Sequence, residues 1–324
     1  MSSTSILFEL SESQKRQYID AETVYLALVQ ARKAAAEVRG TMFWRDLKGT
    51  RTLIRSSASG GQKSLGAHSE STQKLFDSFM LRKTSVEARV KALKAQLATQ
   101  QRLNRAHRVG RVPNVVVNVL NVLENAGVAA HFLVVGTHAL YAFETAAGVR
   151  IAEQAMATRD VDMLFDTRKR LAFFTTMEKL DSSLIGLLRK ADASFEVVED
   201  QHYTARNNDG FEVDIIRRMA GRIDPHPLRM SRAEDDFWAA QVSMGDKLAA
   251  ARRFDQVVVA TSGEMALMRT VHPLDFARIK LALSQQMDRD ANKRGKDALQ
   301  ATIVSALVSD YLPHMAAGKG DAAL

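Results

Sequence analysis

The stretch Thr158–Asp166, TRDVDMLFD, places two carboxylates in a segment that otherwise predicts a buried β-strand. Side chains alternate across a strand, so Asp160 and Asp162 share one face while Val161 and Met163 point to the other. Two like charges side by side repel, and partial burial strengthens the repulsion. A divalent metal ion is the usual cation that compensates such a pair. The alternative is a strand end whose acidic face meets solvent, and for an isolated Asp-x-Asp this is the commoner case.

A second apolar strand is also interrupted by a carboxylate. The stretch FEVDII, residues 211–216, carries Asp214 on the face opposite Val213 and Ile215. Three carboxylates on neighbouring strands are the ligands that two Mg²⁺ ions need to hold a nucleoside triphosphate. Upstream, VVGTHAL predicts a strand that enters a helix at Gly136 and Thr137, where backbone N–H groups can approach phosphates.

The composition predicts an ordinary globular protein. The chain has 324 residues, of which 46% are hydrophobic and 25% are charged, so it can bury a sizeable core. It has no cysteine, which excludes disulfides and thiolate metal sites. We find no signal-peptide pattern and no apolar run long enough to span a bilayer. A cytoplasmic protein without membrane contact is the expectation.

The net charge of +8 is unevenly distributed. Residues 82–111 contain nine Lys or Arg and one acid, Glu87, in a segment that predicts a long helix from about Ser71 to His107. A basic helix attracts RNA or DNA, although many such helices are only solvated surfaces and this one has no aromatic residue for base stacking. Upstream we expect a helix over 11–39, a β-hairpin over Thr41–Ser57 that turns near Lys48, and a Ser/Gly linker over 57–71.

The ordered set VVGTHALYAFETAAGVRI, ATRDVDMLFD and FEVDII resembles the nucleotidyltransferase superfamily that includes DNA polymerase beta. It is similar, more narrowly, to an uncharacterised bacterial group of nucleotidyltransferase-fold proteins, as are GQKSLG and MFWRDLKG before the core. The resemblance implies an α+β fold with a mixed β-sheet core flanked by helices and with helical N- and C-terminal regions. We expect an N-terminal region over 1–110, the nucleotidyltransferase core over 111–220 and a mainly helical region over 221–324.

The resemblance also implies roles for individual residues. Asp160 and Asp162 match the metal-binding pair and Asp214 the third acid, so all three are expected to be catalytic and to bind Mg²⁺ or Mn²⁺. Gly136 and Thr137 match the turn, with Thr137 where Ser or Gly is usual. In abortive-infection-type members a helical Lys and a later Lys-Asp pair flank the nucleotide. The similar residues here are Lys280 and Lys296 with Asp297, whereas Arg289 is expected to be a surface charge.

The expected reaction is transfer of a nucleoside monophosphate from an NTP to an acceptor hydroxyl, with release of pyrophosphate. RNA or tRNA, bound through the basic helix, and a protein are the acceptors considered. A toxin restrained by an antitoxin-like protein partner would use the same chemistry. A non-catalytic nucleic-acid- or protein-binding module that keeps the fold is the main alternative, and the intact set of three acids argues against it.

Overall fold

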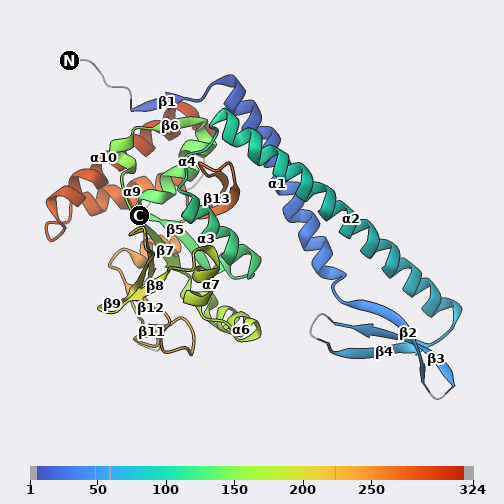
Figure 1. The fold of residues 1–324 in the computed structure, drawn as a ribbon. Helices are drawn as coiled ribbons and strands as arrows, with labels where there is room; N and C mark the ends of the chain where they lie inside the picture. The colour runs from blue at the N-terminus through green and yellow to red at the C-terminus, as the bar shows by residue number, and fades with distance from the viewer. Residues whose placement is uncertain (1–5, 48, 58–59, 223, 317–324) are drawn as a thin grey trace. The chain divides into compact units, whose positions relative to one another are not determined.

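The computed structural model describes residues 6–47, 49–57, 60–222 and 224–316, and the chain forms two compact units (Figure 1). Unit 1 contains the residues up to Lys15 and those from Arg108 onward, and unit 2 contains residues 16–107. Helices and a mixed sheet are both present, which confirms the expected α+β fold.

Unit 2 is built on two long antiparallel helices. Helix α1 (Glu12–Glu37) enters the unit, and α2 (Glu70–His107) leaves it. The side chain of Gln17, near the start of α1, donates a hydrogen bond to Asn104 Oδ1, near the end of α2, at 3.0 Å. Leu28 and Leu97 are buried along these helices, as apolar residues at helical spacing predict.

A three-stranded antiparallel sheet joins the two helices of unit 2. Its order is β2-β3-β4, with β2 at Thr41–Leu47, β3 at Thr50–Ser56 and β4 at Gln62–Ala67. The expected hairpin is confirmed by the β2–β3 pairing, and its turn residue Lys48 lies outside the described residues. The prediction of a linker over 57–71 is wrong for residues 62–67, which form β4 and pair with β3. Polar side chains can face solvent on an edge strand, and Gly66, with φ 124°, lies at the register shift.

The core of unit 1 is a seven-stranded mixed sheet (Figure 1). Strand β7 pairs in parallel with β10 and antiparallel with β5. The other edge of β10 pairs with β9 in its first half and with β12 in its second half. The strands are β5 (Phe132–Val135), β7 (Asp160–Phe165), β8 (Glu196–Val198), β9 (Gln201–Arg206), β10 (Glu212–Arg217), β11 (Leu228–Arg229) and β12 (Trp238–Gln241).

Two strand pairs and a set of helices complete unit 1. The pairs are β1 (Leu7–Glu9) with β6 (Val149–Ile151), and β13 (Arg253–Val259) with β14 (Met265–Val271). Helices α9 and α10 pack against each other. The helices are α3 (Asn114–Asn125), α4 (Leu140–Ala147), α5 (Glu153–Met156), α6 (Arg170–Leu180), α7 (Leu184–Ala191), α8 (Gly245–Ala250), α9 (Pro273–Ser284), α10 (Ala291–Tyr311) and α11 (Pro313–Ala316), with single 3₁₀ turns η1 (Ala129–His131), η2 (Gly136–Ala139) and η3 (Thr167–Lys169).

The alternation of β7 and β10 fixes which face of the sheet carries the acids. Val161, Met163, Val213 and Ile215 are buried at 0 to 2% exposure and hold one face of both strands in the core. The acidic side chains must then project from the other face. In the region from 221 onward, strands β11 to β14 and the short α8 precede the helices that the sequence predicts.

Candidate metal and nucleotide site

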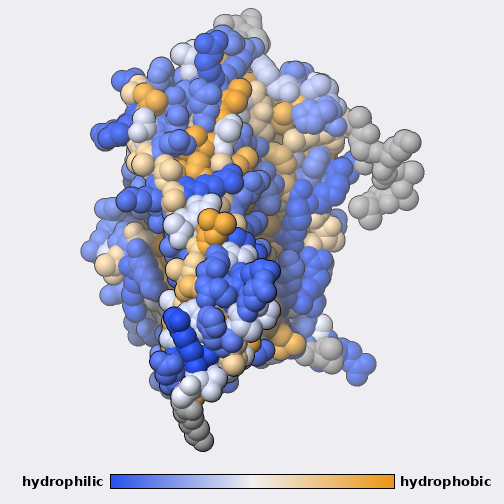
Figure 2. All heavy atoms as spheres, turned by 90° about the vertical axis from the view of Figure 1, so that its right-hand side faces the viewer, coloured by the Kyte–Doolittle hydropathy of each residue, from blue (hydrophilic) through white to orange (hydrophobic). Residues whose placement is uncertain are grey.

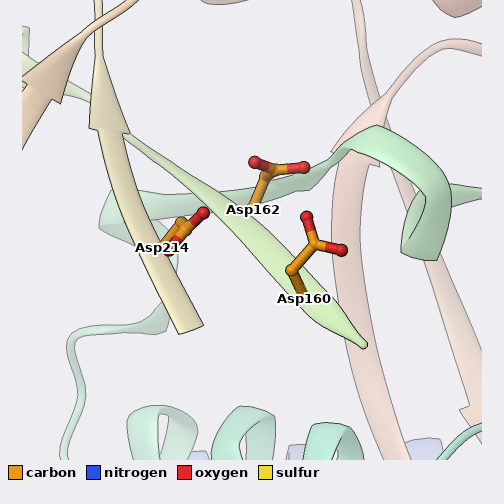
Figure 3. Close-up of side chains that lie close together, drawn as sticks. All are labelled: Asp160, Asp162 and Asp214. Carbon is orange, nitrogen blue, oxygen red and sulfur yellow. The ribbon is translucent and has the colours of Figure 1, made fainter. Parts of the chain in front are cut away.

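The three acids meet at the start of two adjacent parallel strands. Asp160 and Asp162 lie on β7, and Asp214 on β10 lies directly opposite Asp162 in the parallel register. Figure 3 shows the three carboxyl groups close together on one side of these strands. One ligand oxygen from each acid lies within 4.8 Å of the others, and all three side chains are partly buried. The sheet therefore gathers residues that are 52 to 54 positions apart into one cluster.

The negative charges of the three carboxylates repel one another. Burial and, after it, the negative charges of Asp160 and Asp214 raise the pKa of Asp162 to about 7, against the opposite effect of Lys280 and Lys293. Burial also raises the pKa of Asp214, although the hydrogen bond from Thr204 lowers it. Three converging carboxylates, of which Asp162 and Asp214 have disfavoured ionisation, fit a divalent cation, and an all-oxygen donor set fits Mg²⁺ or Mn²⁺.

Two threonine hydroxyls hold the outer acids. Thr204 Oγ1, 1% exposed on β9, donates a hydrogen bond to Asp214 Oδ1 at 2.6 Å. Thr158 Oγ1 donates to Asp160 Oδ1. The local sequence pattern does not mark either threonine as a site residue. Thr204 can be recognised as a site residue only from the β9–β10 register, in which it lies opposite Asp214. The sequence alone does not give this register.

The Gly136–Thr137 turn lies against the cluster. Val135, at the end of β5, pairs with Asp162, and the chain then enters η2 at Gly136 with φ 67°. A Cβ atom at Gly136 would overlap Asp162 Oδ2, so only glycine allows both the left-handed backbone and this close approach. Thr137 is buried, and its hydroxyl accepts a hydrogen bond from Gln300 Nε2 at 3.1 Å. The turn is thereby fixed to α10.

Lys280 faces the acids from α9 and is held by Asp297 from α10. Lys280 Nζ donates to Asp297 Oδ1 at 2.8 Å, and Arg289 Nε donates to Asp297 Oδ2 at 2.5 Å. Asp297 is 2% exposed, so two cations share one buried carboxylate. The expectation that Arg289 is an ordinary surface charge does not describe this position. Lys280 and Arg289 line a pocket of about 300 Å³ together with Gly136 and Asp162. The other residues that line this pocket are mostly apolar, namely Val135, Ile216, Val242, Ser243, Met244, Leu248, Phe276, Ile279 and Leu283.

Two further lysines of α10 act on the same cluster. Lys296 Nζ donates to the carbonyl oxygen of Ala157 at 2.7 Å. Burial lowers the pKa of Lys296, and the positive charge of Lys280 lowers it further, whereas Asp160 raises it. Lys293, which the sequence analysis did not name, is close enough to lower the pKa values of Asp162 and Asp214. The C-terminal helix pair thus supplies the positive charge near the three acids.

His138 packs behind the acids. It is 1% exposed, and its ring lies 5.7 Å from the rings of Tyr141 and Phe211, between centroids. Burial lowers the pKa of His138 to about 4, so the imidazole is neutral near pH 7. Its position is that of a packing residue and not of a base exposed to substrate.

A larger pocket, of about 630 Å³, contains none of the three acids. It includes Arg159, whose side chain alternation directs away from the neighbouring Asp160. The pocket of about 300 Å³ is therefore the better candidate for a nucleotide, although it is smaller. The lining residues of the larger pocket are Val115, Asn118, Arg159, Ala191, Asp192, Asn207, Asp209 and Phe211.

A sheet that gathers three carboxylates beside a glycine turn and several cations is the arrangement of an enzyme that handles phosphate esters. Sequence comparison identifies the family within this class. A family model described as "Nucleotidyltransferase" matches residues 114–322, more than half of the chain, so the chain belongs to this nucleotidyltransferase family. Transfer of a nucleotidyl group, with an NTP as substrate, is what this family implies.

No curated protein and no solved structure matches the chain. Among the residues that the structure describes, no helix is both long enough and apolar enough to cross a membrane.

Proposed function

We propose that this chain is a metal-dependent nucleotidyltransferase of the DNA polymerase beta-like superfamily. It transfers a nucleoside monophosphate from an NTP to an acceptor hydroxyl and releases pyrophosphate. The convergence of Asp160, Asp162 and Asp214 within 4.8 Å, beside the Gly136 turn, is the observation that carries this proposal. A sheet that used these acids only for solubility would not hold them in mutual repulsion.

Asp160, Asp162 and Asp214 are the residues that would hold Mg²⁺ or Mn²⁺. When bound, the metal offsets negative charge on the phosphates and on the leaving pyrophosphate and lowers the pKa of the attacking hydroxyl. The Thr204 hydroxyl donates a hydrogen bond to Oδ1 of Asp214 and so restrains the orientation of that carboxyl group.

The triphosphate would bind between the turn and the C-terminal helix pair. Backbone N–H groups at Gly136 and Thr137 donate to phosphate oxygens, and Lys280 and Lys296 neutralise their charge. Arg289 extends this positive lining, since it shares Asp297 with Lys280. The apolar remainder of the pocket leaves space for the nucleoside.

The acceptor hydroxyl oxygen attacks the α-phosphorus of the NTP, forming a new phosphoester bond. The bond between the α-phosphorus and the bridging oxygen breaks, and that oxygen leaves with the pyrophosphate. Asp214, whose carboxyl group is held by Thr204, would accept the hydroxyl proton. An RNA or tRNA and a protein are the acceptors compatible with this chemistry. A toxin controlled by an antitoxin-like partner would use the same residues.

Isothermal titration calorimetry of each NTP with Mg²⁺ or Mn²⁺ tests the proposal. The Asp160→Ala/Asp162→Ala double variant should lose metal-dependent NTP binding. Glu212→Gln is the matched control, because Glu212 lies on the same strand face but pairs with Arg206 at 2.5 Å. If the folded wild type binds no NTP with either metal, the catalytic proposal fails and a binding module becomes the better description. Transfer of label from an α-³²P-labelled NTP to RNA or protein then identifies the acceptor.

A further inference from the structure

The net positive charge of the chain comes entirely from unit 2. Residues 16–107 contain 17 Lys or Arg and 7 Asp or Glu, a net charge of +10. The rest of the chain contains 28 Lys or Arg and 30 Asp or Glu, a net charge of −2. The candidate site therefore lies in a slightly acidic unit, and the unit without that site carries all of the excess charge.

Four of the 17 Lys or Arg of unit 2 lie on one flank of α2. From Ala88 to His107 the helix has five Lys or Arg and no acid. Lys91, Lys94, Arg102 and Arg105 are all exposed and, at 3.6 residues per turn, fall within a sector of about 80°. Within the described part of the chain, none of these four forms an ion pair, unlike Lys74 and Lys83 in the first half of α2, which pair with Glu70 and Glu87.

The structure holds this flank in place. Gln17 of α1 donates to Asn104 and to Gln100 Oε1 of α2, at 3.0 and 2.8 Å. These bonds and the buried Leu97 fix the rotation of α2, so the flank with the four cations, about 110° around the helix from Leu97 and Asn104, keeps its orientation. A helix of 38 residues is about 57 Å long, and the four cations span about 21 Å of it. That distance corresponds to several successive phosphates of a nucleic acid.

The surface favours a polyanion over an apolar partner. Figure 2 shows a largely hydrophilic face, with hydrophobic side chains only in separate small patches. Two aromatic residues of unit 2 are also not free to stack on bases. Phe79 is buried, and Trp44 packs against Phe76 and lies under the guanidinium of Arg51, 5.3 Å from its ring centroid. Such a flank reads phosphates, not base sequence.

We infer that the exposed flank of α2, with Lys91, Lys94, Arg102 and Arg105, binds the phosphate backbone of an RNA, and that this RNA is the acceptor of the transferred nucleotide. The acceptor role rests on the proposed function, whereas the binding does not. RNA is favoured over DNA because it offers a 2′-hydroxyl on every ribose and two hydroxyls at its 3′ end, whereas a DNA strand offers a single terminal hydroxyl.

Fluorescence anisotropy with labelled tRNA, a short RNA duplex and a DNA duplex of the same sequence tests the inference. In the flank variant, Lys91, Lys94, Arg102 and Arg105 are all changed to Gln, which keeps helix propensity. In the matched control, four exposed lysines of unit 1 are changed to Gln, which removes the same net charge: Lys169, Lys179, Lys190 and Lys247. Circular dichroism checks that both variants keep their helices.

We expect the wild type and the control to bind RNA with a steep dependence on salt between about 50 and 200 mM. The flank variant should bind about 100-fold more weakly or worse, and its slope of log K against log salt should fall by about 3 to 4. Absence of RNA binding, or an equal loss in both variants, would overturn the inference. So would equal competition by polyglutamate, which would indicate an acidic protein partner. Because phosphate contacts alone also bind a DNA duplex, the choice of RNA is overturned if label from the NTP is transferred to the DNA and not to the RNA.

The two proposals fail separately. The Asp160→Ala/Asp162→Ala variant should keep RNA binding and lose NTP binding, whereas the flank variant should keep metal-dependent NTP binding. Transfer of label from the NTP to the bound RNA, abolished in both variants at low RNA concentration, connects the two. If RNA binds at the flank but the label is found only on protein, the acceptor part of the inference is wrong.

Discussion

Replacing Asp162 with Asn should stabilise the metal-free protein. Burial and the negative charges of Asp160 and Asp214 raise the pKa of Asp162 from its ordinary 3.8 to about 7. Between these values the folded protein retains a proton that the unfolded chain loses, so stability falls as the pH rises through this window. Above about pH 7 Asp162 is ionised in the folded protein, and the full cost of this ionisation lowers the free energy of unfolding. A difference of about three pH units corresponds to about 4 kcal/mol at most.

The pH dependence of this gain in stability distinguishes the cost of ionising Asp162 from other effects of the substitution. Asn cannot ionise, so Asp162→Asn should raise the free energy of unfolding by up to about 4 kcal/mol at about pH 8, and by less than about 2 kcal/mol at about pH 5. Added Mg²⁺ should stabilise the wild type and remove most of the advantage, because the cation offsets the same repulsion.

Urea denaturation with EDTA, followed by tryptophan fluorescence, measures this effect. The chain has two tryptophans, Trp44 in unit 2 and Trp238 in unit 1, so a Trp44→Phe background reports unit 1 alone. Glu212→Gln should give no comparable gain, because Glu212 is paired with Arg206. The reasoning is refuted if Asp162→Asn is no more stable than the wild type at about pH 8, or if its gain is the same at both pH values.

Three further substitutions test individual contacts of the site. Thr204→Val should weaken Mn²⁺ binding, measured by electron paramagnetic resonance, about 10-fold or more, because a hydrogen bond to a charged group contributes about 1.5–3 kcal/mol. Gly136→Ala should cost about 1–2 kcal/mol of stability through its left-handed backbone and should also abolish Mn²⁺ binding, because its Cβ displaces the Asp162 carboxylate. Asp297→Asn should destabilise unit 1 by about 3–5 kcal/mol in urea, because it leaves two partly buried cations without their carboxylate.

Each of these substitutions has a matched control. Thr204→Ser keeps the hydroxyl and should restore Mn²⁺ binding; if it does not, the hydrogen bond is not the cause. Gly210→Ala has the same left-handed backbone, with φ 74°, but no overlap, so it should lose stability and keep the metal. Asp275→Asn removes a more exposed pair with Arg252, so a loss equal to that of Asp297→Asn would contradict the burial argument.

The local sequence pattern was sufficient to predict the position of a residue where that position depends only on its own strand or helix. Alternation placed Asp160 and Asp162 on one face, and β7 confirms it. The Gly/Ser-rich segment 57–71 shows where local pattern failed. Its glycines and serines are typical of a loop, yet residues 62–67 form β4, because pairing with β3 satisfies their backbone groups.

The sequence by itself determined the acidic face of β7, the glycine turn and the basic character of α2. These follow from residue type and from periodicities of two or about 3.6 residues. Only the tertiary structure decided which distant groups meet. Thr204 reaches Asp214 through strand register, Lys293 and Arg289 reach the site through the packing of α9 on α10, and residues 16–107 form a separate basic unit. Such contacts arise from the burial of apolar faces between elements far apart in the chain, which no local window of sequence contains.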